Sequence, residues 1–535
     1  MTSTRRKWTR RAALIALASA PLLYFTARKV DELSADPTGE KECPPLSADS
    51  AGELSPPVEV KAPPEPLPWA QTGGTINDAS CLNRTSIYGV VQVTRLEDIQ
   101  NALRFAKENN LKVSMAGVRH SMGGQAFARN AVVLDMTGFN QMSLDEPNKV
   151  LTVQSGATWH AIQNFLHPKY AVKAMQSTDI FTLGGSISVN AHGMDHQVGA
   201  IGRTIRSMRV LLADGSIETL SQTDNPELFN LVVGGYGLFG VIVDVALEVT
   251  DNALYATGRR IVDYQAFPEV FNTELVNDKK LGLMYSHLST GPQSFLREMI
   301  LYTYEETAVA DAEIPALAEV SSTRLRRFVL NFAKLGSLPM RLKWYAEKYV
   351  EPRMEACTVV SRNQALAEGE ACLVSRNEPM HDSVKYLQNN LKNETDILQE
   401  YFIPREQFIT FVDGLRQIMT DHAVTLLNAS VRVVHREDNF LTYAPADMFS
   451  IVLYINQSTD EAGHARMRQV TGELIDLTTR LNGRFFLPYQ LHYTPEQLQK
   501  AYPQINAFFE AKKRYDPRLI LTNTFYEKYS RSFDN

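Results

Sequence analysis

A glycine-rich turn early in the chain carries residue types that suit phosphate binding. The segment from Ala116 to Ala126 reads AGVRHSMGGQA and follows a strand-like stretch. Its glycines let the backbone present successive N–H groups to an anion, as a nest does. His120 stands within this turn, and three roles are open for it: proton transfer, covalent attachment of a cofactor, or that of a solvated loop histidine. The turn itself is predicted to cradle a phosphate.

A second glycine-rich block, residues 183–202, suits a large flat ligand. It reads LGGSISVNAHGMDHQVGAIG, and its glycines and small polar residues allow the backbone to run close along a ligand. His192 and His196 have the i, i+4 spacing of zinc ligands on a helix. However, the flanking glycines disfavour a helix, and Asp195 is the only carboxylate nearby. The block is therefore predicted to wrap a ligand rather than to bind zinc.

A third glycine cluster imitates a dinucleotide-binding motif. Gly235, Gly237 and Gly240 satisfy the pattern G-x-G-x-x-G. That fingerprint needs a strand before it and a helix after it, so that phosphate meets the helix N-terminus. Here a predicted helix comes first and the strand-like stretch VIVDVALEV follows. A tight turn explains these glycines, and a nicotinamide-binding fold is not indicated.

Strands and helices are mixed along the chain, which predicts an α+β fold. The body opens with a strand near Ile87, a helix from Leu96 to Asn109 and the strand LKVSMAG. After Asn482 we expect the strand RFFLPYQLHY, a helix from Pro495 to Arg514 and a terminal strand LILTNTF. The predicted parts are a signal or membrane anchor (1–30), a proline-rich linker (31–75), a ligand-binding domain (76–252), an α/β cap domain (253–484) and a C-terminal segment that returns to the first domain (485–535).

The N-terminus is typical of an export signal or a signal anchor. The basic stretch RRKWTRR precedes an apolar run from Ala12 to Ala27. The order of charges favours a body on the extracytoplasmic side, and the segment TRRAALIAL resembles a twin-arginine signal. Whether the leader is cleaved or retained stays open. The nine prolines between Pro37 and Pro68 predict an extended tether after it.

Charge and cysteine content exclude some functions. The net charge is -6, but seven basic residues and no acidic one lie in the first 30 residues. The rest carries 47 basic and 60 acidic residues, a charge of -13, so nucleic acid is not expected as a partner. The four cysteines include no C-x-x-C pair, so a zinc or dithiol redox site is not indicated. Cys357 and Cys372 could form a disulfide outside the cytoplasm.

Several of these motifs occur together and in order in one family. The GVRHSMGGQAF loop, the VLDM strand, the QSTDIFTLGGSISVNAHG block and the GGYGLFGVIVDV strand resemble the FAD-binding (PCMH-type) domain of the vanillyl-alcohol oxidase superfamily. The chain is most similar to aldonolactone and alditol oxidases and to decaprenylphosphoryl-ribose oxidase. The likeness covers about residues 76–251, with PYQLHYTPEQLQKAYP and KKRYDPRLILTN near the C-terminus. It implies a two-subdomain FAD-binding domain with a cap domain over it.

The resemblance also implies which residues hold FAD. The first loop would cradle the pyrophosphate, and the second block would wrap the flavin. In members with a Gly-x-Gly-His-Ser turn the histidine is linked to the flavin, which makes His120 the candidate here, although Arg119 replaces the second glycine. The implied contacts are Ala116, Gly117, Val118, Arg119, His120, Ser121, Gln125, Ala126, Thr178, Thr182, Gly184, Gly185, Ser188, His192, Val241 and Ile242.

Catalysis by such a protein needs a base and a cation near the flavin. The resemblance places Gln490 and His492 on the flavin-facing C-terminal strand, and His492 is the preferred base because imidazole titrates near neutral pH. Arg432, in the stretch SVRVVHRED, would polarise a substrate oxygen. For both His492 and Arg432, a surface or packing role is the competing interpretation.

The expected activity is FAD-dependent oxidation of a CH–OH group in a sugar, polyol or aldonolactone. Oxygen, a quinone or a redox partner would take the electrons from the reduced flavin. Two alternatives remain: a quinone- or partner-linked dehydrogenase with the same fold, and a flavin-binding protein without catalysis. The expected partners are therefore a small alcohol, an electron acceptor and, through the N-terminal segment, a membrane.

Overall fold

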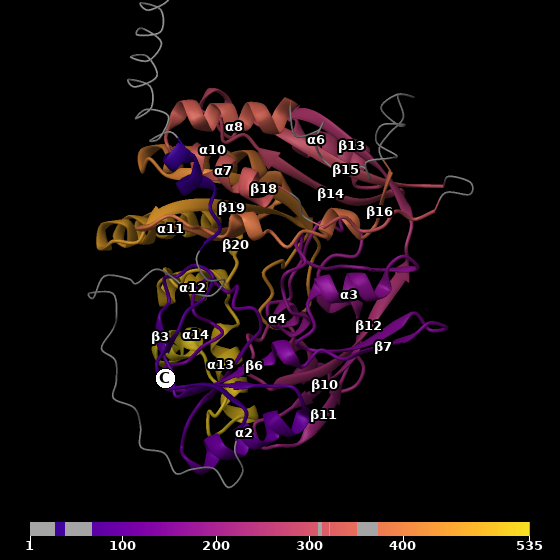
Figure 1. Cartoon of the computed structure of the whole chain (residues 1–535), viewed down its shortest axis with the longest axis vertical. Coiled ribbons are helices and arrows are strands. Elements are labelled where there is room, and N and C mark those ends of the chain that lie inside the picture. The colour runs from indigo at the N-terminus through magenta and orange to yellow at the C-terminus, as the bar shows by residue number, and fades with distance from the viewer. Residues whose placement is uncertain (1–26, 38–66, 309–312, 320–321, 350–372, 534–535) are drawn as a thin grey trace, which may run out of the picture.

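A computed structural model describes residues 27–37, 67–308, 313–319, 322–349 and 373–533. Their mixture of helices and sheets confirms the predicted α+β fold. Figure 1 shows the first domain, in indigo and magenta, below a broad sheet with orange helices. The yellow C-terminal helices lie against the first domain.

The first sheet supports the loop that contains His120. Its strand order is β1-β4-β6-β5, with β4, β6 and β5 parallel and β1 antiparallel. Helix α2 (Leu96–Glu108) forms as predicted, and the carboxylate of Asp98 accepts hydrogen bonds from the backbone N–H groups of Thr94 and Arg95 at its start. The strands are β1 (Trp69–Thr72), β4 (Gly89–Gln92), β5 (Val113–Ala116) and β6 (Val132–Asp135).

A second sheet supports the other two glycine clusters. Its order is β11-β10-β12-β8-β7, and β9 also pairs with β12. The turn with Gly235, Gly237 and Gly240 joins helix α5 to strand β12, as the sequence predicts, and a Cβ on Gly240 would lie 2.3 Å from Val210 Cγ1. The elements are β7 (Met142–Asp145), β8 (Val150–Gln154), α3 (Trp159–Leu166), β9 (Tyr170–Val172), α4 (Leu183–Ser188), β10 (Ile205–Leu211), β11 (Ile217–Leu220), α5 (Pro226–Val232) and β12 (Val241–Asp251).

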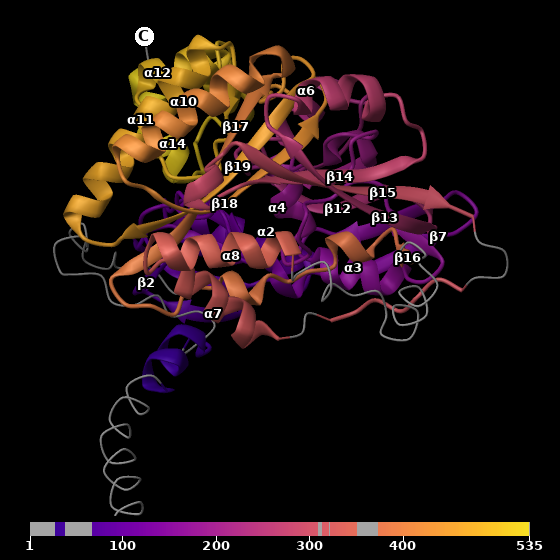
Figure 2. The ribbon, with the colours of Figure 1, turned by 90° about the horizontal axis from the view of Figure 1, so that it is seen from above.

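The cap domain is built on an eight-stranded antiparallel sheet of order β16-β13-β15-β14-β18-β19-β17-β20. Helices α10 and α11 pack on one part of it, and α7 and α8 pack together on another (Figure 2). The elements are β13 (Leu254–Asp263), α6 (Phe267–Val270), β14 (Leu281–Leu288), β15 (Glu298–Thr307), α7 (Thr323–Ala333), α8 (Ser337–Tyr349), β16 (Leu373–Ser375), β17 (Glu394–Pro404), α10 (Phe408–Asp421), β18 (Thr425–Val434), β19 (Met448–Ser458), α11 (Glu461–Arg480) and β20 (Arg484–Phe485).

One continuous apolar core joins the two domains. It contains residues of the second sheet, such as Val245, residues of the cap sheet, such as Ile451, and C-terminal residues such as Phe508. The C-terminal segment also reaches the first sheet, where the N–H of Val113 donates to the carbonyl of Ile520. The boundary near residue 252 therefore divides the sequence into two domains, but these domains share one apolar core.

The C-terminal segment differs from its predicted elements. The stretch RFFLPYQLHY continues as a strand only through Phe485, because Pro488 lacks the N–H that a ladder requires. The helix predicted from Pro495 to Arg514 is divided into α12 (Pro495–Ala501) and α13 (Ile505–Tyr515), since Pro503 disfavours helical backbone at the residue before it. The predicted terminal strand contributes one bridge, Leu521 with Val113, and then leads into α14 (Thr524–Tyr529).

The described part of the N-terminal region docks on the cap. Residues 27–34 are helical, and the Arg324 guanidinium pairs with Asp31 at 2.7 Å. Asn331 donates to the carbonyl of Leu33 at 2.9 Å. The tether expected over residues 31–75 is therefore not extended throughout, because its first residues are packed and its last ones form strands.

Several N-terminal and cysteine predictions concern residues outside the described part. The apolar run 12–27 lies there except for its last residue, and among the described residues no helix is long and apolar enough to cross a membrane. Cys357 and Cys372 also lie outside. Cys81 is disulfide-bonded, whereas the sequence had given no reason to single it out.

Candidate active site

A cavity of about 1130 Å³ lies between the first domain and the cap. Its volume exceeds the roughly 300–1,000 Å³ of an ordinary small-molecule site, so it can hold a large cofactor together with a substrate. All sixteen residues that the sequence predicts as FAD contacts line it. The remainder of the wall comes from the cap sheet and from helices α7 and α8.

The first glycine loop packs closely against Thr182, so no side chain fits at Gly117. A Cβ on Gly117 would lie 2.1 Å from Thr182 Oγ1. Arg119 adopts a left-handed backbone with φ 61°, so the turn keeps a glycine-like conformation although the related motif has glycine at this position. The loop is fastened by Gln125, whose amide donates to the carbonyls of Leu487 (2.7 Å) and Tyr489 (2.9 Å). The Gln125 side chain thus supports the loop.

The imidazole of His120 lies on the cavity wall, as predicted. It makes an edge-to-face contact with Phe181, with ring centroids 5.4 Å apart. Burial lowers the pKa of His120 to about 4, so the ring is neutral at physiological pH. A neutral imidazole keeps a nitrogen lone pair, which a covalent bond to a cofactor requires.

The second glycine block begins with helix α4 and then becomes irregular. Gly184, in the first turn of this helix, lies close to Ser155. A Cβ on Gly184 would be only 2.7 Å from Ser155 Cβ. The helix ends at Ser188, so His192 and His196 do not share a helical face. Their rings have different partners: His192 contacts Glu400, whereas His196 lies near Asp195 and His435. The block lines the cavity instead of forming a two-histidine metal site.

A buried polar cluster on the cap side was missed in the sequence. Glu400, on β17, is 4% exposed, and its Oε1 lies 2.6 Å from His192 Nε2. The hydroxyls of Ser450 (2.5 Å) and Tyr489 (3.2 Å) donate to the same carboxylate. Burial alone would raise the pKa of Glu400, but the interaction with His192, together with Arg432 and Ser450, holds it below its ordinary value. Glu400 is therefore an anion that orients His192.

Arg432, which the sequence suggested as a group that polarises a substrate oxygen, lies in this cluster on β18. Its guanidinium lines the cavity, and its buried Nε has no hydrogen-bond partner among the described residues. His287, on the neighbouring strand β14, also lines the cavity. Burial, together with the charges of Lys343 and Arg432, lowers the pKa of His287 to about 3, so this ring is neutral. An unsatisfied buried cation next to a cavity is suited to an oxyanion of a ligand.

Gln490 and His492 are not brought into the cavity. Gln490 donates to the carbonyl of Met122 and, at 3.2 Å, to Ser80 Oγ, so it anchors the C-terminal segment. His492 lies near Arg468, Lys528 and His464, and burial with these positive charges lowers its pKa to about 3. The positions of these two residues differ from the expectation because the predicted strand stops before Pro488. No flavin-facing strand therefore carries them.

A signal for the missed residues exists in the sequence. Glu400 is the one charged residue in the apolar stretch ILQEYFI, and His287 interrupts LGLMYSHL in the same way. Charged and titratable residues are rarely buried in a strand without a partner or a function. Such isolated polar residues in apolar strands were candidates, but the sequence could not show that their strands face one cavity.

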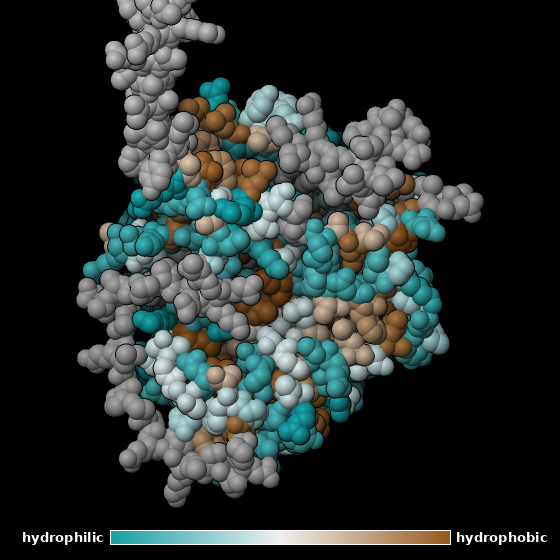
Figure 3. Space-filling view, in the orientation of Figure 1, coloured by the Kyte–Doolittle hydropathy of each residue, from teal (hydrophilic) through white to brown (hydrophobic). Residues whose placement is uncertain are grey.

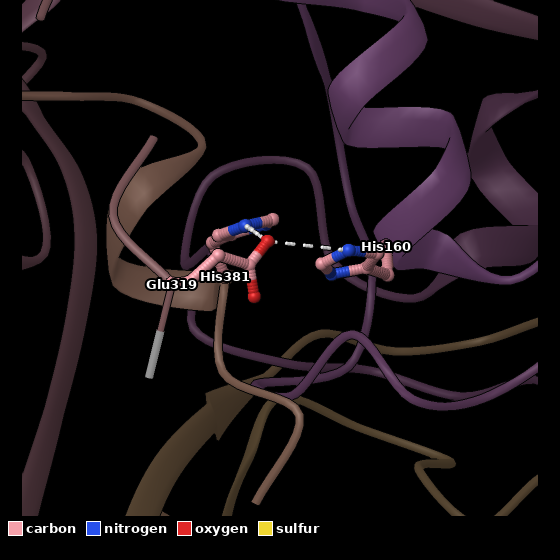
Figure 4. A group of neighbouring side chains, drawn as sticks. All are labelled: His160, Glu319 and His381. Carbon is pink, nitrogen blue, oxygen red and sulfur yellow. Dashed lines mark ion pairs between the residues drawn. The ribbon is translucent and has the colours of Figure 1, made fainter. Parts of the chain in front are cut away.

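A separate group of titratable residues lies at the edge of the cavity (Figure 4). His160 and His381 turn their Nδ1 atoms toward Asp179 Oδ2, at 2.8 and 3.2 Å. Their Nε2 atoms lie 3.4 and 3.5 Å from Glu319 Oε1. The two rings are stacked, 17° from parallel, and each turns one nitrogen toward each of the two carboxylates. The arrangement favours a hydrogen-bonded clasp between the first domain and the cap.

The residues present fit FAD. Both glycine loops line the cavity, and its walls carry buried polar atoms without hydrogen-bond partners among the described residues. These atoms are Ser155 Oγ, Ser177 Oγ, His192 Nδ1, Arg259 Nε and Arg432 Nε. In native proteins such atoms usually have a partner, which a bound phosphate-bearing and heteroaromatic ligand can supply.

Comparisons with known proteins agree with this site. The FAD binding domain family matches residues 87–221, and the D-arabinono-1,4-lactone oxidase family matches residues 318–529. The chain adopts the fold of a solvent-stable cholesterol oxidase, with a TM-score of 0.67 and 15% identity, over 88% of this chain and 99% of that one.

The relatives found by sequence match only part of the chain. An uncharacterized oxidoreductase ORF5 of the fasciation locus of Rhodococcoides fascians is 34% identical over 30% of this chain and 37% of its own length. Decaprenylphosphoryl-beta-D-ribose oxidase of Mycolicibacterium smegmatis is 28% identical over 34% of this chain and 38% of its own. Cytokinin dehydrogenase 2 of Arabidopsis thaliana is 30% identical over 31% of this chain and 34% of its own. This chain thus spans well under half of these relatives.

Proposed function

We propose that this chain, an oxidoreductase of the PCMH-type flavoprotein superfamily with FAD as its cofactor, oxidises a CH–OH group of a sugar, polyol or aldonolactone. The observation that carries the proposal is the polar cluster of His192, Glu400 and Arg432, which faces the same cavity as the two glycine loops. A cofactor site and a proton-transfer site therefore share one enclosed space.

The cofactor would be held by the first domain. The backbone of the loop from Ala116 to Ser121 would bind the pyrophosphate, and the block from Thr178 to His192 would lie along the ring system. Bound FAD supplies a hydride acceptor. Covalent attachment through His120 is part of this proposal, supported by the neutral imidazole on the cavity wall.

The chain's own residues would handle the proton and the negative charge. Glu400 accepts a hydrogen bond from His192 Nε2, which leaves the unpaired Nδ1 as the atom that would accept the carbinol proton. Arg432 would stabilise the developing alkoxide through its unpaired guanidinium N–H. In this proposal His192 replaces His492 as the base.

The substrate class is supported by two observations. Residues 318–529 match the D-arabinono-1,4-lactone oxidase family, and these residues include most of the cap. The cap side of the cavity also presents polar groups that suit hydroxylated substrates, including Ser430, Asn428 and Tyr302. The electron acceptor is oxygen in this proposal, and a quinone or partner protein is the alternative.

The experiment is a flavin assay on the full chain purified in detergent. The visible spectrum is recorded, and flavin reduction is followed anaerobically with a panel of sugars, polyols and lactones. We expect rapid bleaching with at least one of them and hydrogen peroxide on admission of oxygen. Bleaching by a substrate without peroxide would favour the dehydrogenase, and a bound flavin that no alcohol bleaches would support the non-catalytic alternative.

Acid precipitation of the same sample tests the linkage. Yellow colour in the pellet that disappears in His120→Ala would support attachment through His120. A yellow supernatant from the parent protein would refute it. Tyr489→Phe serves as a control, since it alters the cavity wall without removing an imidazole.

We also propose that the body lies on the extracytoplasmic side, attached by its N-terminal segment. The basic stretch followed by an apolar run supports this orientation. The disulfide at Cys81 agrees with it, because disulfides persist in oxidising compartments. Proteolysis of spheroplasts tests the proposal: protection of the body from added protease would contradict it.

A further inference from the structure

The exposed apolar residues of the cap are concentrated on the α7–α8 hairpin, residues 323–349. Among the described residues, ten large hydrophobic side chains are exposed, and six of them lie on this hairpin. Leu338 is 64% exposed and Tyr345 is 58% exposed. The six are Leu325, Leu335, Leu338, Leu342, Tyr345 and Tyr349. Figure 3 shows brown side chains over this part of the surface.

The inner face of the hairpin is both apolar and polar. Met340 and Trp344 of α8 are buried, and so are Arg327 and Asn331 of α7, each 2% exposed. The hairpin therefore packs on the cap through this inner face and still leaves leucines and tyrosines outside. In water, an exposed patch of this kind marks a binding surface. A lipid phase is the environment in which outward leucines are stable.

The charges of the hairpin are mostly neutralised within the protein. Residues 323–349 contain seven Lys and Arg and one Glu. Six of the seven basic side chains pair with a carboxylate, namely Arg324, Arg326, Arg327, Lys334, Lys343 and Lys348. The case for a lipid surface therefore rests on the outward leucine and tyrosine side chains, which are typical of the apolar face of an interfacial helix.

The hairpin also lies where the N-terminal segment leaves the body. Asp31 and Asp36 pair with Arg324 and Arg327 of α7, so residues 27–37 are held against it (Figure 2). The apolar run from Ala12 to Ala27 immediately precedes this docked segment. The first described residues, which directly follow the apolar run in sequence, therefore lie beside the exposed hairpin.

The hairpin is one wall of the active-site cavity. Leu325, Val329 and Leu330 of α7 line the cavity, as do Lys343 and Ala346 of α8. A molecule that leaves a bilayer beneath the hairpin would meet apolar side chains first and the polar cluster around Arg432 afterwards.

We propose that the α7–α8 hairpin rests on a lipid bilayer and that the alcohol substrate enters the cavity from the lipid phase. The substrate class this implies is an amphiphilic alcohol, with an apolar portion against the hairpin and its CH–OH group near Arg432. The docking part is independent of the enzymatic activity, whereas the entry part rests on the proposed function.

Fluorescence quenching tests the docking. The full chain carrying Leu338→Trp is reconstituted into vesicles of neutral and anionic phospholipid with brominated acyl chains. We expect the added tryptophan signal to fall by about half relative to unbrominated vesicles, because interfacial helices bury their apolar face in the acyl boundary. Ile217→Trp, on the first domain, is the control and should be unaffected. Equal signals for Leu338→Trp in both vesicles would overturn the proposal, whether or not the enzyme is active.

A second copy of the chain is the competing occupant of this face. Sedimentation of the detergent-solubilised protein distinguishes self-association from lipid docking. A dimer that dissociates in Leu338→Asp would assign the face to self-association and refute lipid docking, whereas a monomer in both forms supports docking.

Kinetics test the entry route. In Leu335→Asp/Leu338→Asp, KM for an acyl-chain alcohol held in vesicles should rise about tenfold, since each outward leucine contributes apolar burial in lipid. KM for a short water-soluble alcohol should stay within about twofold, because neither residue lines the cavity. Equal effects on both alcohols would refute entry from the lipid. If no alcohol is turned over at all, the proposed function fails while the quenching result still stands.

Discussion

The two walls of the cavity differ in how they are built. The first-domain wall comes from a few contiguous loops, and Gly117 and Gly184 let these loops pack closely against Thr182 and Ser155. The cap wall consists of side chains from separate strands, with His287 on β14, Arg432 on β18 and Glu400 on β17. Local motifs specify the first wall, whereas strand register specifies the second. This difference predicts distinct outcomes when each wall is altered.

The largest effect is expected at the first wall. Gly117→Val should abolish FAD binding, because even a Cβ would lie 2.1 Å from Thr182 Oγ1 and a branched side chain would push the loop away from Thr182. The absorbance ratio at 450 and 280 nm measures flavin content and should fall by roughly tenfold or more. Gly472→Ala, where a Cβ meets nothing closer than 3.9 Å, is the control. Full flavin content in Gly117→Val would mean that the cofactor lies elsewhere.

A change at the second wall should spare the cofactor and reduce the rate. Arg432→Ala should lower kcat by about 10²–10³, the usual loss when a donor to a developing oxyanion is removed. Its flavin spectrum should be unchanged, and Arg432→Lys should recover part of the rate. Arg436→Ala, which removes an exposed ion pair with Asp438 farther along the chain, is the matched control. Loss of flavin in Arg432→Ala would show that the cap wall also holds the cofactor, and would contradict the difference between the two walls.

The pH dependence of stability should report the second wall as well. Burial lowers the pKa of His287 to about 3, whereas an unfolded histidine titrates near 6.5. Its contribution is therefore fully present above pH 6.5 and is lost as the pH falls, since the unfolded state then binds the proton first. Below pH 6 the loss approaches about 1.4 kcal/mol per pH unit.

Denaturant unfolding at pH 7, 6 and 5 measures this loss. Between pH 6 and pH 5, the free energy of unfolding should fall by about 1.4 kcal/mol less in His287→Asn than in the parent. His464→Asn, a partly exposed histidine of α11, should change the slope less. Identical slopes in the parent and His287→Asn would show that this ring titrates normally.

The smallest effect is expected outside both walls. His492→Ala should leave kcat within about twofold of the parent, because His492 is not among the residues that line the cavity. Steady-state kinetics with the best alcohol substrate measure it. A fall in kcat as large as that of Arg432→Ala would support His492 as the base, as the sequence suggested, and would contradict the proposed role of His192.

The same contrast explains what the sequence could reveal. The glycine loops and the order strand, loop, strand were readable because each motif is local, so all sixteen predicted FAD contacts lie on the cavity. Arg432 was found, but Glu400 and His287 were not, because their partnership arises from sheet order β14-β18-β19-β17. Gln490 and His492 were misplaced because Pro488 ends the strand that was expected to carry them.

The shared apolar core has a consequence for exchanging parts. Val245, Ile451 and Phe508 belong to one cluster, although they come from the first domain, the cap and the C-terminal segment. A cap transplanted from a relative would bring its own core residues. These would not fit the core residues of the first domain and the C-terminal segment that remain. Substrate range in this protein should therefore evolve by replacing individual side chains on the cap strands, and not by recombining whole domains at residue 252.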